Sequence, residues 1–360
     1  MITALTFVGG LIALTVGAEM LVRGASRIAS SMGISPLVVG LTVVALGTSS
    51  PELAVGVGAA LMGQGDIAVG NVVGSNIFNV LVILGLSALI VPLAVAHQIV
   101  RFDVPLLIGC SLMLALISMD GVLGRLDGAL LFAGVIAYTS YLVWQARKER
   151  DAAVIAEYAE AYPGSAARHW VINLSLILLG LVLLVFGAEW LVAAAIVFAR
   201  QLGLSELVIG LTIVAAGTSL PEVAASVVAA IRGERDIAVG NAIGSSIFNI
   251  LLVLGVTALV APAGIAVAQS VQNFDLPVMI AVSVACLPIL FTGYRIDRWE
   301  GAVFLAYYLA YTGFVILKAT EHDLLDPFSH VMVVFVLPIT ILTLVVVLIR
   351  AWLARGKPHA

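Results

Sequence analysis

Two copies of one short motif hold the residues with the clearest chemical potential. Glu52 ends the segment GTSSPE (47–52), and Glu222 ends the segment GTSLPE (217–222). Each Glu lies near the middle of a long apolar run, where an ionised carboxylate is costly unless it has a partner. The apolar runs carry no Lys or Arg at that depth. A dissolved cation is therefore the favoured partner, and a protonated, inert Glu is the alternative.

The proline of each motif should break its helix. Pro51 has no N–H and crowds the carbonyl group of Gly47, and Pro221 does the same to Gly217. Irregular backbone at membrane depth is tolerated only where protein buries it or where it lines a cavity. We therefore predict that backbone carbonyl oxygens around each Glu point into the interior.

A stripe of polar side chains follows each motif at helical spacing. Residues four apart share one helical face, and each copy places Asn, Ser and Asn at this interval. The stripes consist of Asn71, Ser75 and Asn79 and of Asn241, Ser245 and Asn249. They predict further oxygen ligands, and hydrogen bonding between helices is the alternative role.

These residue types favour a hard cation. Calcium takes about 6–8 oxygen ligands from carboxylates, carbonyls and water, and the carbonyl groups of Thr48 and Thr218 could complete a shell around two Glu. Two carboxylates also neutralise one divalent ion. Sodium could use the surrounding Ser, Asn and carbonyl oxygens, whereas magnesium gives up water reluctantly. Soft metals are disfavoured because the motifs contain no Cys or His.

The composition shows where these groups must lie. The 360 residues are 62% apolar and only 11% charged, against about 25% charged in a soluble domain. Two cysteines exclude a disulfide scaffold, and a net charge of −4 without a basic block excludes a nucleic-acid partner. The chain is predicted to be an all-α polytopic membrane protein whose partner is the lipid bilayer, with no obligate protein partner evident.

Apolar runs bounded by charges or turn residues predict eleven membrane helices. Their expected ranges are 2–31, 35–62, 67–91, 101–119, 126–146, 169–201, 205–231, 237–261, 274–292, 299–318 and 330–354. Among the acidic residues outside the two motifs, Asp66, Asp103, Asp236 and Asp275 are expected to cap helices. Glu19 could pair with Arg23, four residues later on the same helix.

The chain contains an internal repeat. Both motifs and both stripes recur 170 positions apart, which gives each copy five helices. Because five is odd, the second copy must cross the membrane in the opposite sense, as in many secondary transporters. The expected divisions are a first half (1–146), a cytoplasmic connector (147–168), a second half (169–318) and a loop, extra helix and basic tail (319–360). A duplicated scaffold without transport is the alternative.

Basic residues predict the orientation. With the N-terminus outside, fourteen of the seventeen Lys and Arg residues fall in inside loops or the C-terminal tail, as the positive-inside rule requires. We therefore expect a multi-pass protein of the inner or plasma membrane with a cytoplasmic C-terminus.

The two motifs and stripes resemble the calcium/cation antiporter superfamily, specifically the prokaryotic sodium/calcium exchangers. The resemblance covers the first ten predicted helices. It implies a secondary active antiporter without a cofactor, which exchanges Ca²⁺ for Na⁺ by alternating access and binds the ions at the midplane between the repeats. The ligands that it implies are Ala45, Thr48, Ser49, Glu52, Ser75, Asn79, Ala215, Thr218, Ser219, Glu222, Ser245 and Asn249. The two alanines would act through their carbonyl groups.

Two features depart from this family pattern. Asn stands at both 79 and 249, whereas well-studied exchangers of the family have Asp at one of these positions. The eleventh helix is also additional. The GTSxPE motif favours sodium coupling over the proton coupling of the related Ca²⁺/H⁺ antiporters.

Two other classes of function remain to be compared. A passive cation channel is the less favoured alternative, because channels usually build selectivity from rings of symmetric subunits. An intramembrane protease would need motifs that are absent here, such as HExxH or a Ser–His pair. The chain is therefore not expected to be an enzyme.

Overall fold

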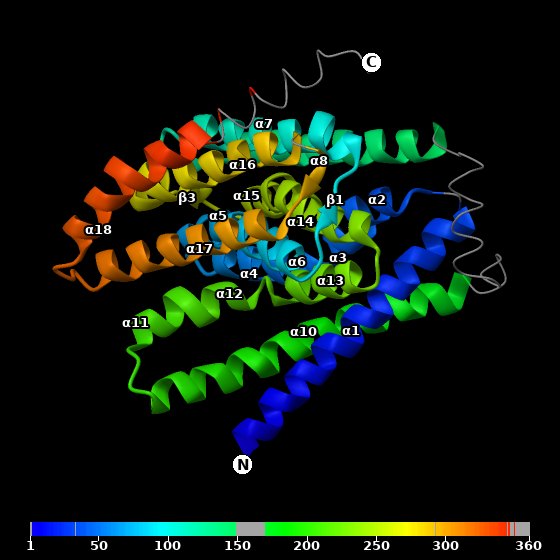
Figure 1. The fold of residues 1–360 in the computed structure, drawn as a ribbon, viewed down its shortest axis with the longest axis horizontal. Helices are drawn as coiled ribbons and strands as arrows, with labels where there is room; N and C mark the ends of the chain where they lie inside the picture. Colours follow the sequence, from blue (N-terminus) through cyan, green and yellow to red (C-terminus); the bar gives the residue numbers. More distant parts are fainter. Residues whose placement is uncertain are drawn as a thin grey trace.

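The computed structural model describes residues 2–32, 34–148, 170–291 and 293–343, together with Val345 and Ile349. These residues form an almost wholly helical bundle with two very short strand pairs (Figure 1). The predicted connector lies almost entirely outside the described residues, and α8 continues as far as Lys148.

The first repeat runs from α1 to α8. Its helices are α1 (Ile2–Met32), α2 (Pro36–Val39), α3 (Ala45–Thr48), α4 (Ser50–Leu61), α5 (Gly65–Phe78), α6 (Gly85–Ile90), α7 (Val104–Ile117) and α8 (Arg125–Lys148). Short π-helical segments interrupt them at η1 (Gly40–Val44), η2 (Asn79–Leu84) and η3 (Ile99–Asp103). The strands are β1 (Leu93–Ala94) and β2 (Val122–Leu123).

The second repeat follows the same order. Its helices are α10 (Trp170–Gln201), α11 (Glu206–Ile209), α12 (Ala215–Gly217), α13 (Leu220–Ile231), α14 (Arg235–Phe248), α15 (Gly255–Val260), α16 (Leu276–Phe291) and α17 (Arg298–Ala319). The π segments are η5 (Gly210–Val214), η6 (Asn249–Leu254) and η7 (Val271–Asp275), and the strands are β3 (Ile265–Ala266) and β4 (Arg295–Ile296).

The helices agree with the predicted membrane spans. Within the described residues nine helices are long and apolar enough to cross a bilayer, and the bent pair Pro36–Thr48 and Ser50–Leu61 makes a tenth. The path from α11 to α13 corresponds to the span predicted at 205–231, but it is divided into short pieces. The predicted eleventh helix appears as α18 (Leu325–Val331) and η8 (Met332–Val336), within a span of Leu325–Thr343.

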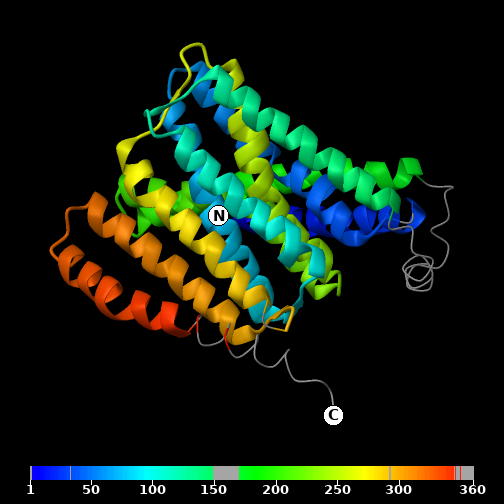
Figure 2. The same ribbon diagram turned by 90° about the horizontal axis from the view of Figure 1, so that it is seen from above.

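This last span starts five residues before the predicted position 330. Pro327 does not prevent the earlier start, because it lies in the first turn of α18, where a missing N–H is harmless. It lies beside α17 at the edge of the bundle (Figure 2). The predicted end of the helix, at 354, falls outside the described residues.

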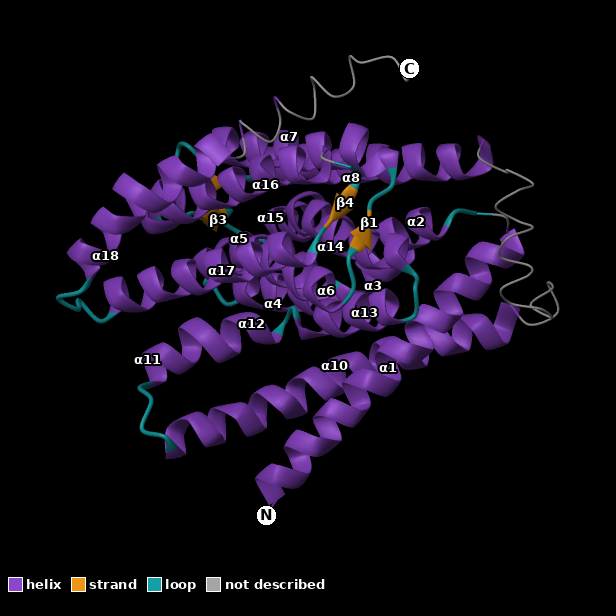
Figure 3. Cartoon of the chain, viewed as in Figure 1, coloured by secondary structure: helices purple, strands orange, loops and turns teal. Residues whose placement is uncertain are grey.

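The short strands join loops of different repeats (Figure 3). Leu93 pairs with Ile296, and Leu123 pairs with Ile265, both in antiparallel register. Exchange of the two repeats converts one pair into the other, so the strands follow an internal two-fold relation. Each pair also joins loops that the basic-residue bias predicts to lie on the same side of the membrane.

Helices α1 and α10 pack closely against each other, apart from most of the bundle in the view of Figure 1. A Cβ atom on Gly17 would lie 2.8 Å from the carbonyl oxygen of Gly180, and one on Gly180 would lie 2.7 Å from that of Gly17. Only glycine allows this backbone approach, as in the small-residue interfaces of membrane helices.

The predicted capping roles of the four aspartates are wrong. Asp103 and Asp275 each end a π segment that runs straight into the next helix, and they accept hydrogen bonds from Tyr138 (3.0 Å) and Tyr311 (2.8 Å) instead. Asp66 and Asp236 lie in the first turns of α5 and α14, inside rather than at the cap positions. For Asp103 and Asp275 the sequence pattern missed the π segments η3 and η7, which start the helical path four residues before each aspartate. For Asp66 and Asp236 it placed the helix start too late.

Candidate functional site

Each Glu lies just after a break in its helix. Helix α3 ends at Thr48, Ser49 has φ −78° and ψ 5°, and α4 begins at Ser50 with a bend of 41° between the two parts. The second copy breaks likewise between α12 and α13, where Ser219 has φ −91° and ψ 4°. The predicted proline-associated breaks are therefore present in both repeats.

The break gives each carboxylate a favourable position. Glu52 and Glu222 lie in the first turns of α4 and α13. The N-terminal end of a helix carries partial positive charge from its unpaired N–H groups, which favours a carboxylate there. The fold thus offsets part of the cost of burying negative charge without using a basic side chain.

The two repeats cross at the carboxylates. The Ser219 hydroxyl donates to Glu52 Oε1 at 3.2 Å, and the Ser49 hydroxyl donates to Glu222 Oε1 at 3.5 Å. Both Glu side chains are fully buried. The Oε2 atom of each has no hydrogen-bond partner in the described part of the chain. One oxygen of each carboxylate therefore remains available to a ligand.

The threonines of the motifs contact the stripes of the opposite repeat. The Thr48 hydroxyl donates to Asn241 Oδ1 at 3.1 Å, and the Thr218 hydroxyl donates to Asn71 Oδ1 at 3.3 Å. Asn241 also donates through Nδ2 to the backbone oxygen of Glu222 at 3.2 Å. The two threonine bonds hold the broken helix of each repeat against the polar stripe of the other repeat, whereas the Asn241–Glu222 bond joins α14 to α13 within the second repeat.

The serines of the stripes reach the same centre. The Ser75 hydroxyl lies 3.1 Å from that of Ser219. The Ser245 hydroxyl lies 3.4 Å from that of Thr48 and 3.5 Å from the backbone oxygen of Ala45. Residues from α3–α4, α5, α12–α13 and α14 thus meet in one polar cluster inside an apolar bundle.

Asn79 and Asn249 are buried at the starts of η2 and η6. Neither amide atom of Asn79 has a hydrogen-bond partner among the described residues, and Asn249 Oδ1 has none either. Asn249 Nδ2 donates to Asn76 Oδ1 at 3.2 Å. Unpaired buried polar atoms are rare in folded proteins, so these amides are candidates for contact with an ion.

The structure brings most predicted site residues together, but the two repeats are not equally closed. Ala45 and Thr48 are buried, whereas Ala215 is exposed and Thr218 is partly exposed. The α2–η1–α3 segment packs on α14, where a Cβ on Gly244 would lie 3.0 Å from Leu41 Cα. A Cβ on Gly74, the equivalent position, would meet nothing within 4 Å.

Three asparagines at the cluster were absent from the ligand set that the family resemblance implied, namely Asn71, Asn76 and Asn241. Asn71 and Asn241 belong to the predicted stripes, so their helical spacing already indicated the shared face. Asn76 lies one position outside that spacing and is nonetheless buried in contact with the second repeat. Its one sequence signal is that its counterpart in the other repeat is Ser246.

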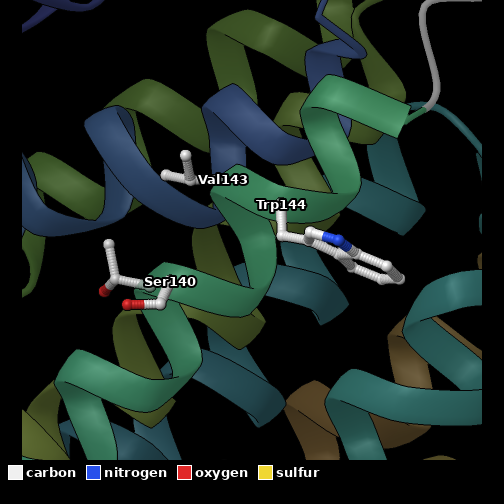
Figure 4. Close-up of a pocket in the computed structure, with 4 residues that line it drawn as sticks. Ser140, Val143 and Trp144 are labelled. Atoms are coloured by element: carbon white, nitrogen blue, oxygen red, sulfur yellow. The ribbon is translucent and has the colours of Figure 1, made fainter.

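Other parts of the described structure offer no competing centre. No group of three or more His, Cys, Asp or Glu residues is placed to hold a metal ion within the described ranges. A surface pocket on α8, lined by Thr139, Ser140, Val143 and Trp144, shares no residue with the polar cluster (Figure 4). Glu19 on α1 does pair with Arg23 as predicted, and it also pairs with Arg232.

Over most of its length the chain is similar to proteins that are named as antiporters or as sodium/calcium exchangers. It is 42% identical over 306 residues to the protein CaxA of Alkalimonas amylolytica, a match that covers 84% of this chain and 95% of CaxA. It is 35% identical over 338 residues to sodium/calcium exchanger MaX1 of Methanosarcina acetivorans, covering 84% and 95% of the two chains.

A solved structure of the sodium-calcium exchanger NCX_Mj, soaked with Na⁺ and Sr²⁺, has the same fold. It superposes with a TM-score of 0.72 at 33% sequence identity and covers 88% of this chain and 97% of its own. The family model described as "Sodium/calcium exchanger protein" matches residues 2–146 and 172–317. These matches confirm the resemblance inferred from the motifs, and the chain belongs to the sodium/calcium exchanger family of multi-pass membrane antiporters.

Proposed function

We propose that this protein exchanges Ca²⁺ for Na⁺ through the polar cluster between the repeats. The observation that carries the proposal is the pair of fully buried carboxylates, each with one oxygen lacking a protein partner. No ion pair joins either Glu to a basic side chain among the described residues. The names of MaX1 and NCX_Mj, both sodium/calcium exchangers, support the choice of ions.

Twelve residues are proposed as ligands. They come from equivalent positions of the two repeats: Ala45, Thr48, Ser49, Glu52, Ser75 and Asn79, with Ala215, Thr218, Ser219, Glu222, Ser245 and Asn249. Carboxylate, amide, hydroxyl and carbonyl oxygens suit Ca²⁺. Two carboxylates balance either one Ca²⁺ or two Na⁺, so both loaded forms could be electrically neutral in a site that tolerates little net charge.

We propose alternating access as the transport mechanism. The unequal closure of the two halves supports it: Ala45 is buried against α14, whereas the equivalent Ala215 is exposed. In an inverted repeat, exchange of the two local conformations would close the second broken helix and open the first. The cluster would then face the opposite side.

The overall plan remains that of the sequence prediction. We propose two inverted halves, 1–146 and 169–318, joined by a cytoplasmic connector at 147–168 and followed by an extra segment at 319–360. The N-terminus is proposed to lie outside and the C-terminus in the cytoplasm, in the inner or plasma membrane. The pairing of β1 with β4 and of β2 with β3 supports the predicted grouping of the loops, because each pair joins two loops that are expected on the same side; the basic-residue bias alone supports the absolute orientation.

Flux measurements test the proposal. Purified protein in liposomes should take up radioactive calcium when an outward sodium gradient is imposed, and uptake should stop without internal sodium. Uptake driven by a proton gradient alone would identify the Ca²⁺/H⁺ antiporter alternative instead. Calcium flux in the absence of both gradients would identify a passive channel.

A further inference from the structure

The two repeats differ at one buried position beside the proposed ligands. Asn76 follows Ser75 on α5, and Ser246 follows Ser245 on α14. The surrounding residues match: each segment reads Gly-Ser-x-Ile-Phe-Asn and ends at a buried Asn, Asn79 or Asn249. Both variable side chains are also buried. The substitution of Ser for Asn therefore breaks the internal symmetry next to the ion cluster.

Asn76 forms a relay of two hydrogen bonds across the repeat interface. Its Nδ2 donates to the backbone oxygen of Ser246 at 3.0 Å, and its Oδ1 accepts from Asn249 Nδ2 at 3.2 Å. A backbone carbonyl oxygen can only accept, so Asn76 must turn its NH₂ group toward Ser246. Its own oxygen, which also can only accept, then requires Asn249 to present Nδ2.

The relay fixes the direction of the Asn249 oxygen. With Nδ2 held by Asn76, Oδ1 must face the other way, where it is buried and has no hydrogen-bond partner among the described residues. Asn249 shares a helical face with Ser245, which contacts Thr48 and Ala45 of the cluster. An amide oxygen oriented in this way need not reorganise when a cation arrives.

The first repeat lacks the equivalent relay. The Ser246 hydroxyl donates to Ala242 O of its own helix at 2.9 Å. Asn79, the counterpart of Asn249, has no hydrogen-bond partner on either amide atom within the described chain. Its orientation is thus not set by the other repeat.

We propose that Asn76 is a positioning residue that holds the Asn249 amide with its oxygen toward the cation cluster, so that the second repeat supplies a preoriented ligand and the first an adjustable one. This inference rests on the proposed function. Hydrogen-bond partners that orient metal ligands typically contribute about 10–100-fold in metal affinity. The asymmetry would make the two halves of the cluster unequal in cation affinity although their ligand types are the same.

The primary test compares Asn76→Ser with Ser246→Ala. The first substitution gives both repeats serine at this position, whereas the second removes a hydroxyl that serves only its own helix and leaves the backbone oxygen that holds Asn76. Sodium-driven calcium uptake should show KM for calcium raised about 10–100-fold by Asn76→Ser with kcat largely kept, and little change for Ser246→Ala. An unchanged KM in Asn76→Ser, or an equal rise in Ser246→Ala, would overturn the inference.

A double-mutant cycle separates positioning from general packing. If Asn76 acts through Asn249, then Asn76→Ala should raise KM in the wild-type background and add little in an Asn249→Ala background. Equal effects in both backgrounds would mean that Asn76 supports the fold rather than the ligand. Asn76→Thr serves as the second variant if melting without cations shows that a smaller side chain does not fold.

The wild-type protein distinguishes a failure of the proposed function from a failure of the inference about Asn76. Absence of sodium-driven uptake by wild-type protein would refute the proposed function whatever the variants do. Calcium-induced rise of the melting temperature in detergent then still measures cation binding. A smaller rise in Asn76→Ser than in Ser246→Ala supports the positioning role, and equal rises refute it.

Discussion

At the residue scale, the site depends on charge that the protein itself does not neutralise. Glu52 and Glu222 are fully buried, and each accepts a hydrogen bond from a serine of the opposite repeat. The helix N-termini and hydroxyl donors reduce the cost of the ionised form, but they carry no full positive charge. In the proposed function, a bound cation would complete the charge balance of the two carboxylates.

We expect Glu52→Gln and Glu222→Gln each to abolish calcium exchange. Removal of one partner from a buried charge interaction typically costs about 3–5 kcal/mol, which corresponds to a loss of affinity of at least about 100-fold. Calcium uptake in liposomes provides the measurement. Glu189→Gln on α10 is the control, because that carboxylate is exposed. Uptake near the wild-type rate in either motif variant would show that the two-carboxylate site is wrong.

The two amides should respond differently to an added charge. Asn79→Asp places a carboxylate where no hydrogen bond is lost, whereas Asn249→Asp loses the donor that Asn76 Oδ1 requires and sets acceptor against acceptor. An unsatisfied buried polar group costs about 1–3 kcal/mol. We therefore expect Asn79→Asp to retain more sodium-driven exchange, by about 5-fold or more.

Exchange rates of these two variants, measured side by side against sodium concentration, check this expectation. Each variant is the control for the other, since both add one carboxylate at equivalent positions. Equal loss in the two, or greater loss in Asn79→Asp, would contradict the assigned orientation of the Asn249 amide.

Much of the site could be predicted from residue types and spacing. The repeated GTSxPE motif and the stripes identified the two carboxylates and most of the hydroxyl and amide groups that meet. The hydrogen bonds between the two repeats could not be predicted. Sequence spacing shows that Ser219 is near a Glu, but not that its hydroxyl bonds Glu52 of the other repeat rather than Glu222 of its own repeat. The sequence analysis did not identify Asn76, because its proposed role depends on the backbone oxygen of Ser246, which no side-chain pattern reveals.

At the element scale, close helix contacts and π segments position the cluster. In the described chain π segments occur at matching places in both repeats, as η1 and η5, η2 and η6, and η3 and η7. In η1 the Ala45 N–H donates to Gly40 O, five residues earlier, and Ala215 does the same with Gly210 O. Such π turns often mark functional sites. Apolar periodicity predicted the membrane spans but could not detect the π segments within them, because a single extra residue barely alters an all-apolar run.

The glycine contact between α1 and α10 predicts opposite effects of one substitution at two positions. In Gly180→Ala the new methyl group would lie 2.7 Å from Gly17 O, whereas in Gly313→Ala on α17 it would meet nothing within 4 Å. Overpacking typically costs about 1–3 kcal/mol, and replacing an unconstrained helical Gly by Ala gains about 0.5–1 kcal/mol.

Melting temperatures of the detergent-purified variants measure these effects. We expect a lower melting temperature for Gly180→Ala and an unchanged or higher one for Gly313→Ala. A Gly180→Ala variant as stable as Gly313→Ala would show that the two helices separate easily and that the close contact does not matter for stability.

At the scale of the whole molecule, the internal two-fold relation governs both the fold and the site. It exchanges β1–β4 with β3–β2, the Thr48–Asn241 bond with Thr218–Asn71, and the Tyr138–Asp103 pair with Tyr311–Asp275. Sequence repetition predicted this relation. The unequal packing of α3 and α12 could not be predicted, because nearly identical motifs adopt two local environments and the difference is a property of the conformation.

The same relation makes one alanine pair a sharp test of topology. Ala94 on β1 and Ala266 on β3 are equivalent and exposed. The predicted inverted arrangement would place them at opposite membrane faces. The native thiols, Cys110 and Cys286, are buried, so a membrane-impermeant maleimide should not label wild-type protein. In intact cells we expect the reagent to label Ala266→Cys but not Ala94→Cys, because the basic-residue bias puts the β3 loop outside.

Permeabilised cells are the control, and in them the reagent should label both variants. Labelling of Ala94→Cys alone would reverse the orientation, and labelling of both variants in intact cells would mean that the two repeats do not cross the membrane in opposite senses.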